Sequence, residues 1–295
     1  MNKAISILCG GILAAALTLS AAAQTIVVGG KAFTEQQIMT AMTVELLKAK
    51  GFSPKREAGM GSAAVRSALE NGQIDVYWEY TGTGLGVFNK ITDKFPSAEE
   101  TYKRIKEVDA AKGLVWLNMS QVNNTYAFAM NRDQAQKLNI VTMSDLAKAV
   151  NGGAKLTFAS NAEFYARPDG LPGWQTAYGF EFPRDNVKRM DTGLVYSALK
   201  DRQVDTGVVF ATDGRIPAFN FVVLKDDKHY APWYNLTPVV RKEILDKYPK
   251  IADALNALAA KLNDETMARL NASVDVDKKT VEEVASGFLK SNGLI

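Results

Sequence analysis

Short apolar runs alternate with longer amphipathic stretches along the chain. Residues 25–28 form a continuous apolar run that ends at two glycines, a pattern typical of a buried strand in a parallel sheet. A helix is predicted next, with Thr34 as its N-cap, Gln37 as the capping-box partner and an end near Gly51. Its apolar stripe consists of Ile38, Met42 and Leu46.

The same pattern follows directly. Ser62 is placed to cap a helix over residues 63–70, Asn71 and Gly72 would end it, and residues 74–77 resemble the next strand. Alternating strands and helices predict an α/β fold.

An internal repeat suggests two lobes. Residues 64–84 and 194–214 align without gaps at an offset of 130 residues and match at seven positions. The matches are Val65/Val195, Ser67/Ser197, Ala68/Ala198, Leu69/Leu199, Gln73/Gln203, Asp75/Asp205 and Gly84/Gly214. Two equivalent α/β lobes are the simplest cause, and chance similarity is the alternative.

The division between the lobes is predicted from two crossing strands. Residues 125–130 are expected to form a strand leaving the first lobe, and residues 219–224 a strand returning to it. Lobe 1 would then comprise residues 24–126 and 221–295, and lobe 2 residues 127–220. Helices predicted at 238–248, 251–262 and 281–290 would complete lobe 1.

The amino terminus predicts export. Residues 1–3 include a lysine, residues 4–19 are uncharged and apolar, and Ala21, Ala22 and Ala23 supply the small residues of a cleavage site. A signal peptide over residues 1–23 with cleavage before Gln24 is therefore expected, and a periplasmic location. A retained anchor is the alternative, although the run is short for a bilayer span of about 20 residues.

Composition removes several classes of function. The 295-residue chain has a net charge of only +3 and no basic block, so nucleic acid is an unexpected partner. Its one histidine is His229 and its one cysteine is Cys9, which argues against metal sites, cofactors and Cys/His catalysis. Residues 82–86 are glycine-rich, but they lack the lysine and spacing of a phosphate loop.

Aromatic residues at predicted strand ends are the candidate chemistry. Tyr80 closes one strand, Phe210 holds the equivalent place in the second repeat, and Tyr126 lies where the chain would cross between lobes. Tyr234 follows Pro232 and Trp233. Ligands of α/β sheets bind beyond the carboxyl ends of strands, so Tyr80 and Phe210 should face one cleft from opposite sides. We call Tyr80, Tyr126, Phe210 and Tyr234 the aromatic box.

Two cations are expected beside the aromatic box. Lys31 lies in the turn before the first helix, and Arg167 lies in the corresponding loop of the second lobe. A trimethylammonium group has no N–H to donate, so ring faces can both desolvate and attract it. Rings and cations together suit a zwitterion with a quaternary ammonium and a carboxylate. Arg167 is expected to bind the anionic end, so that its loss penalises glycine betaine more than choline.

Five segments in this order resemble the substrate-binding proteins of osmoprotectant ABC importers, which take up glycine betaine, choline, carnitine or proline betaine. The segments are GKAFTEQ at 30–36, IDVYWEYTGT at 74–83, NNTY at 123–126, EFYARPDG at 163–170 and ATDGRI at 211–216. The ending, with LNASV at 270–274 and FLK at 288–290, looks most like the osmotically inducible branch.

The resemblance implies a fold, a site and a partner. The fold would be that of a type II periplasmic binding protein, acting as a monomer that performs no bond chemistry and delivers its ligand to a membrane permease. Ligand contacts are implied at Lys31, Tyr80, Thr83, Tyr126, Arg167 and Tyr234. Phe210 falls where many members have a tyrosine and Trp78 where most have a proline, so Trp78 is expected to reshape the cleft wall.

Two rival functions remain at this stage. An amino-acid-binding protein of the same architecture would need an acceptor for the ligand's ammonium, and Glu79 and Asp213 are the candidates. An exported hydrolase is disfavoured by the single histidine and the absence of nucleophile motifs.

Overall fold

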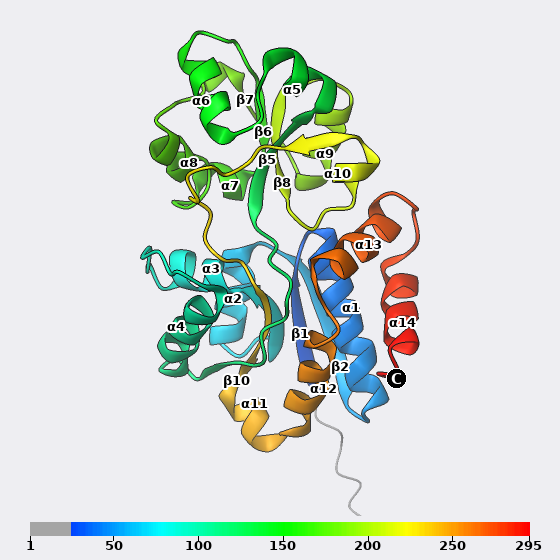
Figure 1. The fold of residues 1–295 in the computed structure, drawn as a ribbon. Coiled ribbons are helices and arrows are strands. Elements are labelled where there is room, and N and C mark those ends of the chain that lie inside the picture. Colours follow the sequence, from blue (N-terminus) through cyan, green and yellow to red (C-terminus); the bar gives the residue numbers. More distant parts are fainter. Residues whose placement is uncertain (1–24) are drawn as a thin grey trace, which may run out of the picture.

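The computed structural model describes residues 25–295 as two lobes, each with one five-stranded sheet flanked by helices. Figure 1 shows the second lobe above the first, with two stretches of chain running between them. The predicted signal peptide and the cleavage position before Gln24 lie outside the described residues. No helix within 25–295 is long and apolar enough to cross a membrane.

The first sheet has the strand order β2-β1-β3-β10-β4. Its strands are β1 (Thr25–Lys31), β2 (Ser53–Met60), β3 (Val76–Tyr80), β4 (Leu114–Trp116) and β10 (Leu236–Arg241). Strand β1 is parallel to β2 and β3, whereas β10 runs antiparallel between β3 and β4. The helices of this lobe are α1 (Thr34–Ala49), α2 (Ser62–Glu70), α3 (Thr81–Thr83), the π-helix η1 (Gly84–Phe88), α4 (Ala98–Ala110), α11 (Lys242–Lys247), α12 (Lys250–Ala259), α13 (Asp264–Asp275) and α14 (Val281–Ser291).

The second sheet has the order β7-β6-β8-β5-β9, again with one antiparallel strand, β5, next to the edge strand. Its strands are β5 (Tyr126–Asn131), β6 (Phe158–Ser160), β7 (Val187–Arg189), β8 (Thr206–Phe210) and β9 (Phe221–Val223). Its helices are α5 (Arg132–Leu138), α6 (Met143–Asn151), α7 (Ala162–Ala166), α8 (Leu171–Tyr178), the 3-10 helix η2 (Arg184–Asn186), α9 (Thr192–Lys200) and α10 (Arg215–Ala218).

The 130-residue repeat is a structural repeat. Helix α2 and strand β3 are displaced from α9 and β8 by 130 residues at both ends, and each pair holds the same place in its lobe. Asp75 accepts a hydrogen bond from the backbone N–H of Val27 at 2.8 Å, and Asp205 accepts one from that of Thr157 at 2.7 Å. The matched aspartates therefore tie equivalent neighbouring strands together in the two lobes.

The return to the first lobe differs from the prediction. Strand β9, within the predicted returning segment 219–224, pairs with β5 in the second sheet, so the boundary expected at residue 221 is too early. Residues 225–231 still contact the second lobe, and the chain then returns to the first sheet as β10. Residues 238–241 of the predicted helix belong to β10, because the apolar residues Val239 and Val240 are buried by pairing on both sides; helix α11 begins only at Lys242.

Two predicted helix caps also differ. Thr34 is the first residue of α1, whose N-cap residue is Phe33, and the Thr34 hydroxyl donates to Asp275 at 2.8 Å. Ser62 is likewise the first residue of α2. Neither helix has a side-chain cap hydrogen bond, because the N-cap residues Phe33 and Gly61 carry no polar side chain.

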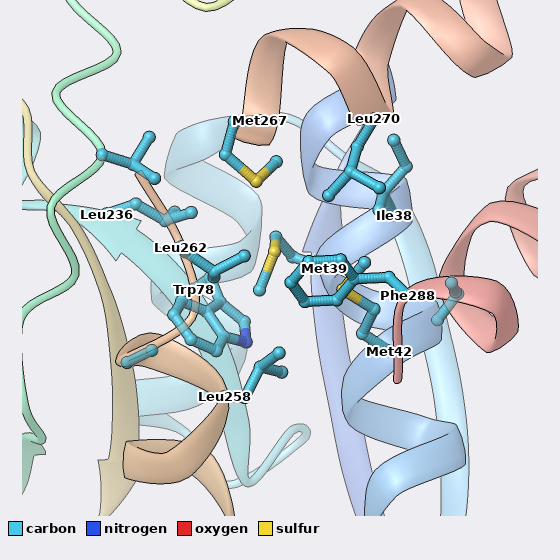
Figure 2. Packing of buried hydrophobic residues seen from close by; sticks show 14 of the residues in the cluster. Ile38, Met39, Met42, Trp78, Leu236, Leu258, Leu262, Met267, Leu270 and Phe288 are labelled. Atoms are coloured by element: carbon cyan, nitrogen blue, oxygen red, sulfur yellow. The ribbon is translucent and has the colours of Figure 1, made fainter. Parts of the chain in front are cut away.

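Helix α1 is buried between its sheet and the carboxy-terminal helices. Figure 2 shows Met39 and Met42 of α1 beside Trp78, Leu258 of α12 and Phe288 of α14. Trp78 is 1% exposed, and its Nε1–H donates to Thr43 at 2.9 Å. The expectation that Trp78 reshapes the cleft wall is therefore wrong, because its ring packs in the core beneath α1.

Candidate functional site

A cleft of about 1400 Å³ lies between the lobes and is the candidate ligand site. It is larger than the roughly 300–1000 Å³ typical of small-molecule pockets. All seven residues proposed from the sequence line it: Lys31, Tyr80, Thr83, Tyr126, Arg167, Phe210 and Tyr234.

The fold explains why these residues meet. Lys31, Tyr80 and Phe210 are the last residues of β1, β3 and β8, so they lie at the carboxyl ends of strands. Tyr126 opens β5 directly after the first crossing, and Tyr234 lies at the end of the second. The crossing segments pair at Asn123 and Asn235. Both tyrosines thus lie close to the point at which the crossing segments pair.

Rings form a continuous wall from one lobe to the other. Phe33 stacks on Phe210 with centroids 5.0 Å apart, and on Tyr80 at 6.2 Å. Tyr126 lies 5.1 Å from Phe210 and meets Tyr234 edge to face at 5.7 Å. Burial raises the pKa values of the Tyr80, Tyr126 and Tyr234 hydroxyls well above their usual range, so these phenols stay neutral and able to donate.

Arg167 has a partner for each of its five N–H groups. Nε and Nη2 bind the two oxygens of Asp169 at 2.5 and 2.7 Å, and Nη1 reaches Tyr126 OH at 3.0 Å and Glu163 at 3.2 Å. The second Nη2 hydrogen points to Thr83 at 3.3 Å. Asp169 also accepts from Tyr234 OH at 2.5 Å. Arg167 therefore fixes two rings of the aromatic box, one directly and one through Asp169.

Lys31 is also paired. Its Nζ lies 2.6 Å from Glu79, which is fully buried and accepts further hydrogen bonds from the hydroxyl of Tyr77 and the backbone of Tyr80. The two cations expected to clamp an anion are thus each neutralised by neighbouring carboxylates. A ligand carboxylate would have to take over donors that now serve Asp169, Glu163 or Glu79.

Four cleft-side residues were missed from the sequence as site residues. Phe33, Glu35, Glu163 and Asp169 all lie within segments that carry the family resemblance, and that is the signal that could have indicated them. Phe33 and Glu163 line the cleft. Glu35 and Asp169 lie behind it and bind residues that line it.

The arrangement suits recognition of a cation without hydrogen-bond donors. Several aromatic side chains and the Glu163 carboxylate line one cleft, and ring faces attract and desolvate a diffuse positive charge. Within residues 25–295, no group of three His, Cys, Asp or Glu side chains is placed to hold a metal ion.

Two lobes of the same topology, two crossing segments and an inter-lobe ligand cleft define a type II periplasmic binding protein, a fold shared with solved binding-protein structures. Residues 24–291 match the OpuAC family, described as the substrate binding domain of ABC-type glycine betaine transport systems. The chain belongs to this family.

Relatives agree over nearly the whole chain. A glycine-betaine-binding protein of Pseudomonas aeruginosa is 44% identical, covering 99% of this chain and 95% of its own. A carnitine transport binding protein of Listeria monocytogenes is 34% identical over 91% of this chain and 87% of its own. The crystal structure of a glycine betaine/carnitine/choline ABC transporter is similar with a TM-score of 0.73, at 30% identity, covering 91% and 99% of the two chains.

Proposed function

We propose that this protein captures a quaternary-ammonium osmolyte, glycine betaine or a close relative, and delivers it to the membrane permease of an ABC importer. Membership of a substrate-binding family agrees with a role in capture without bond chemistry. The observation that carries the choice of ligand is the aromatic box, with the Glu163 carboxylate beside it in the cleft. We further propose that the protein acts as a monomer, with one cleft per chain.

The rival amino-acid ligand lacks its expected acceptors. Glu79 is fully buried and engaged by Lys31, Tyr77 and Tyr80, and Asp213 forms an ion pair with Arg215 at 2.6 Å. Neither residue lines the cleft. A primary ammonium needs several acceptors to replace its water, whereas a trimethylammonium group needs none.

A thermal-shift screen tests the proposal. Glycine betaine, choline and carnitine should raise the melting temperature, because a ligand that binds only the native state stabilises it; glycine and sugars should not. A shift with glycine or another primary amino acid and none with the betaines would favour the rival function.

Binding proteins of ABC importers work outside the cytoplasmic membrane, and we propose that this chain reaches the periplasm by cleavage before Gln24. The basis is the short apolar run followed by Ala21, Ala22 and Ala23. Intact-mass measurement of periplasmic protein should give a chain that begins at Gln24. A retained Met1 or a lipid adduct would contradict this.

A further inference from the structure

Glu35 is a buried carboxylate at which both lobes meet. It is the second residue of α1 and is 2% exposed. Oε1 accepts from Tyr80 OH at 2.7 Å and from the Asn124 amide at 3.0 Å. Oε2 accepts from Thr212 Oγ1 at 2.5 Å and from the Asn271 amide at 3.1 Å. All four partners donate, so they offset part of the cost of burying this carboxylate, although burial still raises the pKa of Glu35 above its ordinary value.

The four donors come from four separate parts of the chain. Tyr80 ends β3 and Asn271 lies on α13, both in the first lobe, while Asn124 lies in the first crossing segment. Thr212 follows β8 and belongs to the second lobe. The Glu35–Thr212 hydrogen bond is therefore a direct link between the lobes, in addition to the two crossings.

Further contacts hold the same loop of the second lobe against the first. The carbonyl of Thr212 accepts from Asn271 at 3.0 Å, and Arg215 lies 3.3 Å from Asp275 of α13. A Cβ at Gly214 would come within 2.4 Å of Ala272. Loop 211–215 is thus packed closely onto α13, and Thr212 is the point at which it reaches Glu35.

This link lies directly behind the ligand-binding rings. Tyr80, whose hydroxyl Glu35 holds, lines the cleft from the first lobe. Phe210, two residues before Thr212, lines it from the second lobe. Phe33, two residues before Glu35, stacks between them. A bond between Glu35 and Thr212 therefore joins the chain segments that carry both faces of this wall.

We propose that Glu35 and Thr212 are positioning residues that join the lobes at the base of the cleft and fix the separation of Tyr80 and Phe210 for the ligand. The inference deepens the proposed function and rests on it in one respect: the affinity measurement below requires that the protein binds glycine betaine. It assigns no ligand contact to either residue. Their effect on affinity is transmitted through the two rings.

Thr212→Val tests the link, because valine keeps the shape of threonine and removes the hydroxyl. The buried Glu35 carboxylate then loses one donor, and we expect the dissociation constant for glycine betaine to rise about tenfold. The unliganded protein should also show a larger radius of gyration by small-angle X-ray scattering. Thr212→Ser keeps the hydroxyl, so its dissociation constant and its radius of gyration should be those of the wild-type protein.

Thr206→Val is the matched control. Thr206 is fully buried and its hydroxyl donates to Ala129 at 3.0 Å, but both residues lie in the second lobe. This variant should lower the melting temperature without changing the radius of gyration or the affinity. If Thr212→Val and Thr206→Val give the same affinity and the same radius, the inference is overturned, as it is if Thr212→Ser fails to rescue.

The two proposals fail in different ways. If the wild-type protein binds none of glycine betaine, choline and carnitine, the proposed function fails, while scattering of the unliganded variants still decides the role of Thr212. If Thr212→Val does not fold, Thr212→Ala removes the same hydroxyl with a smaller side chain and takes its place in both measurements.

Discussion

Arg167→Ala should weaken binding of glycine betaine by about a hundredfold and binding of choline to a smaller but measurable extent. The substitution removes the donors that hold Tyr126 and Thr83, and it leaves Asp169 without its counter-charge beside Tyr234. Losing charge-assisted hydrogen bonds of about 1.5 to 3 kcal/mol each accounts for an effect of this size. The loss should be larger for glycine betaine, whose carboxylate can also use Arg167.

Calorimetric titration of both ligands measures this effect. Arg202→Ala is the control, because Arg202 pairs with Asp133 on the surface at 2.7 Å and such exposed pairs contribute little. Unchanged choline binding in Arg167→Ala would mean that Arg167 does not position the rings. Equal losses for the two ligands would mean that it does not bind the anionic end.

Tyr126→Ala should weaken every trimethylammonium ligand by about tenfold, whether or not the ligand carries a carboxylate. Tyr126 is in contact with Phe164, Phe210 and Tyr234, so its removal opens the centre of the ring wall. A desolvated ring contributes about 0.5 to 2 kcal/mol to binding a cation. Competition between radiolabelled choline and unlabelled betaines gives the relative affinities.

Tyr126→Phe separates the ring from its hydroxyl. Phenylalanine keeps the aromatic face and loses only the hydrogen bond from Arg167, so its affinity should fall a few-fold at most. If the alanine and phenylalanine variants lose affinity equally, the hydroxyl and not the ring face is the important group.

Local patterns predicted much of the lobe architecture, because the same contacts recur within each repeat. The matched Asp75 and Asp205 each bind the backbone of the neighbouring strand 48 residues away, so one sequence signature serves both lobes. The return of the chain was harder to place. Strands β9 and β10 are both short and apolar, and pairing with distant strands decides which sheet each joins.

Part of the site was also predicted from local patterns. Strand ends and helix starts locate Lys31, Tyr80 and Phe210 at one edge, and the corresponding loop of the second lobe adds Arg167. The family resemblance added Thr83. The partners of the cations were not predictable from spacing alone. Glu35, for example, is hydrogen-bonded to residues 45, 89, 177 and 236 positions away, and only the folded chain brings these donors to one carboxylate.

The proposed function requires a ligand whose head group is positively charged and carries no hydrogen-bond donor. Comparing the binding of two ligands tests this directly. Choline and its uncharged carbon analogue 3,3-dimethylbutan-1-ol have nearly the same shape but differ in the charge that ring faces and carboxylates recognise. Calorimetric titration of the wild-type protein should show binding of choline and at least tenfold weaker binding of the alcohol. Equal affinity for the two would show that the cleft recognises shape alone, and would contradict recognition of a quaternary ammonium.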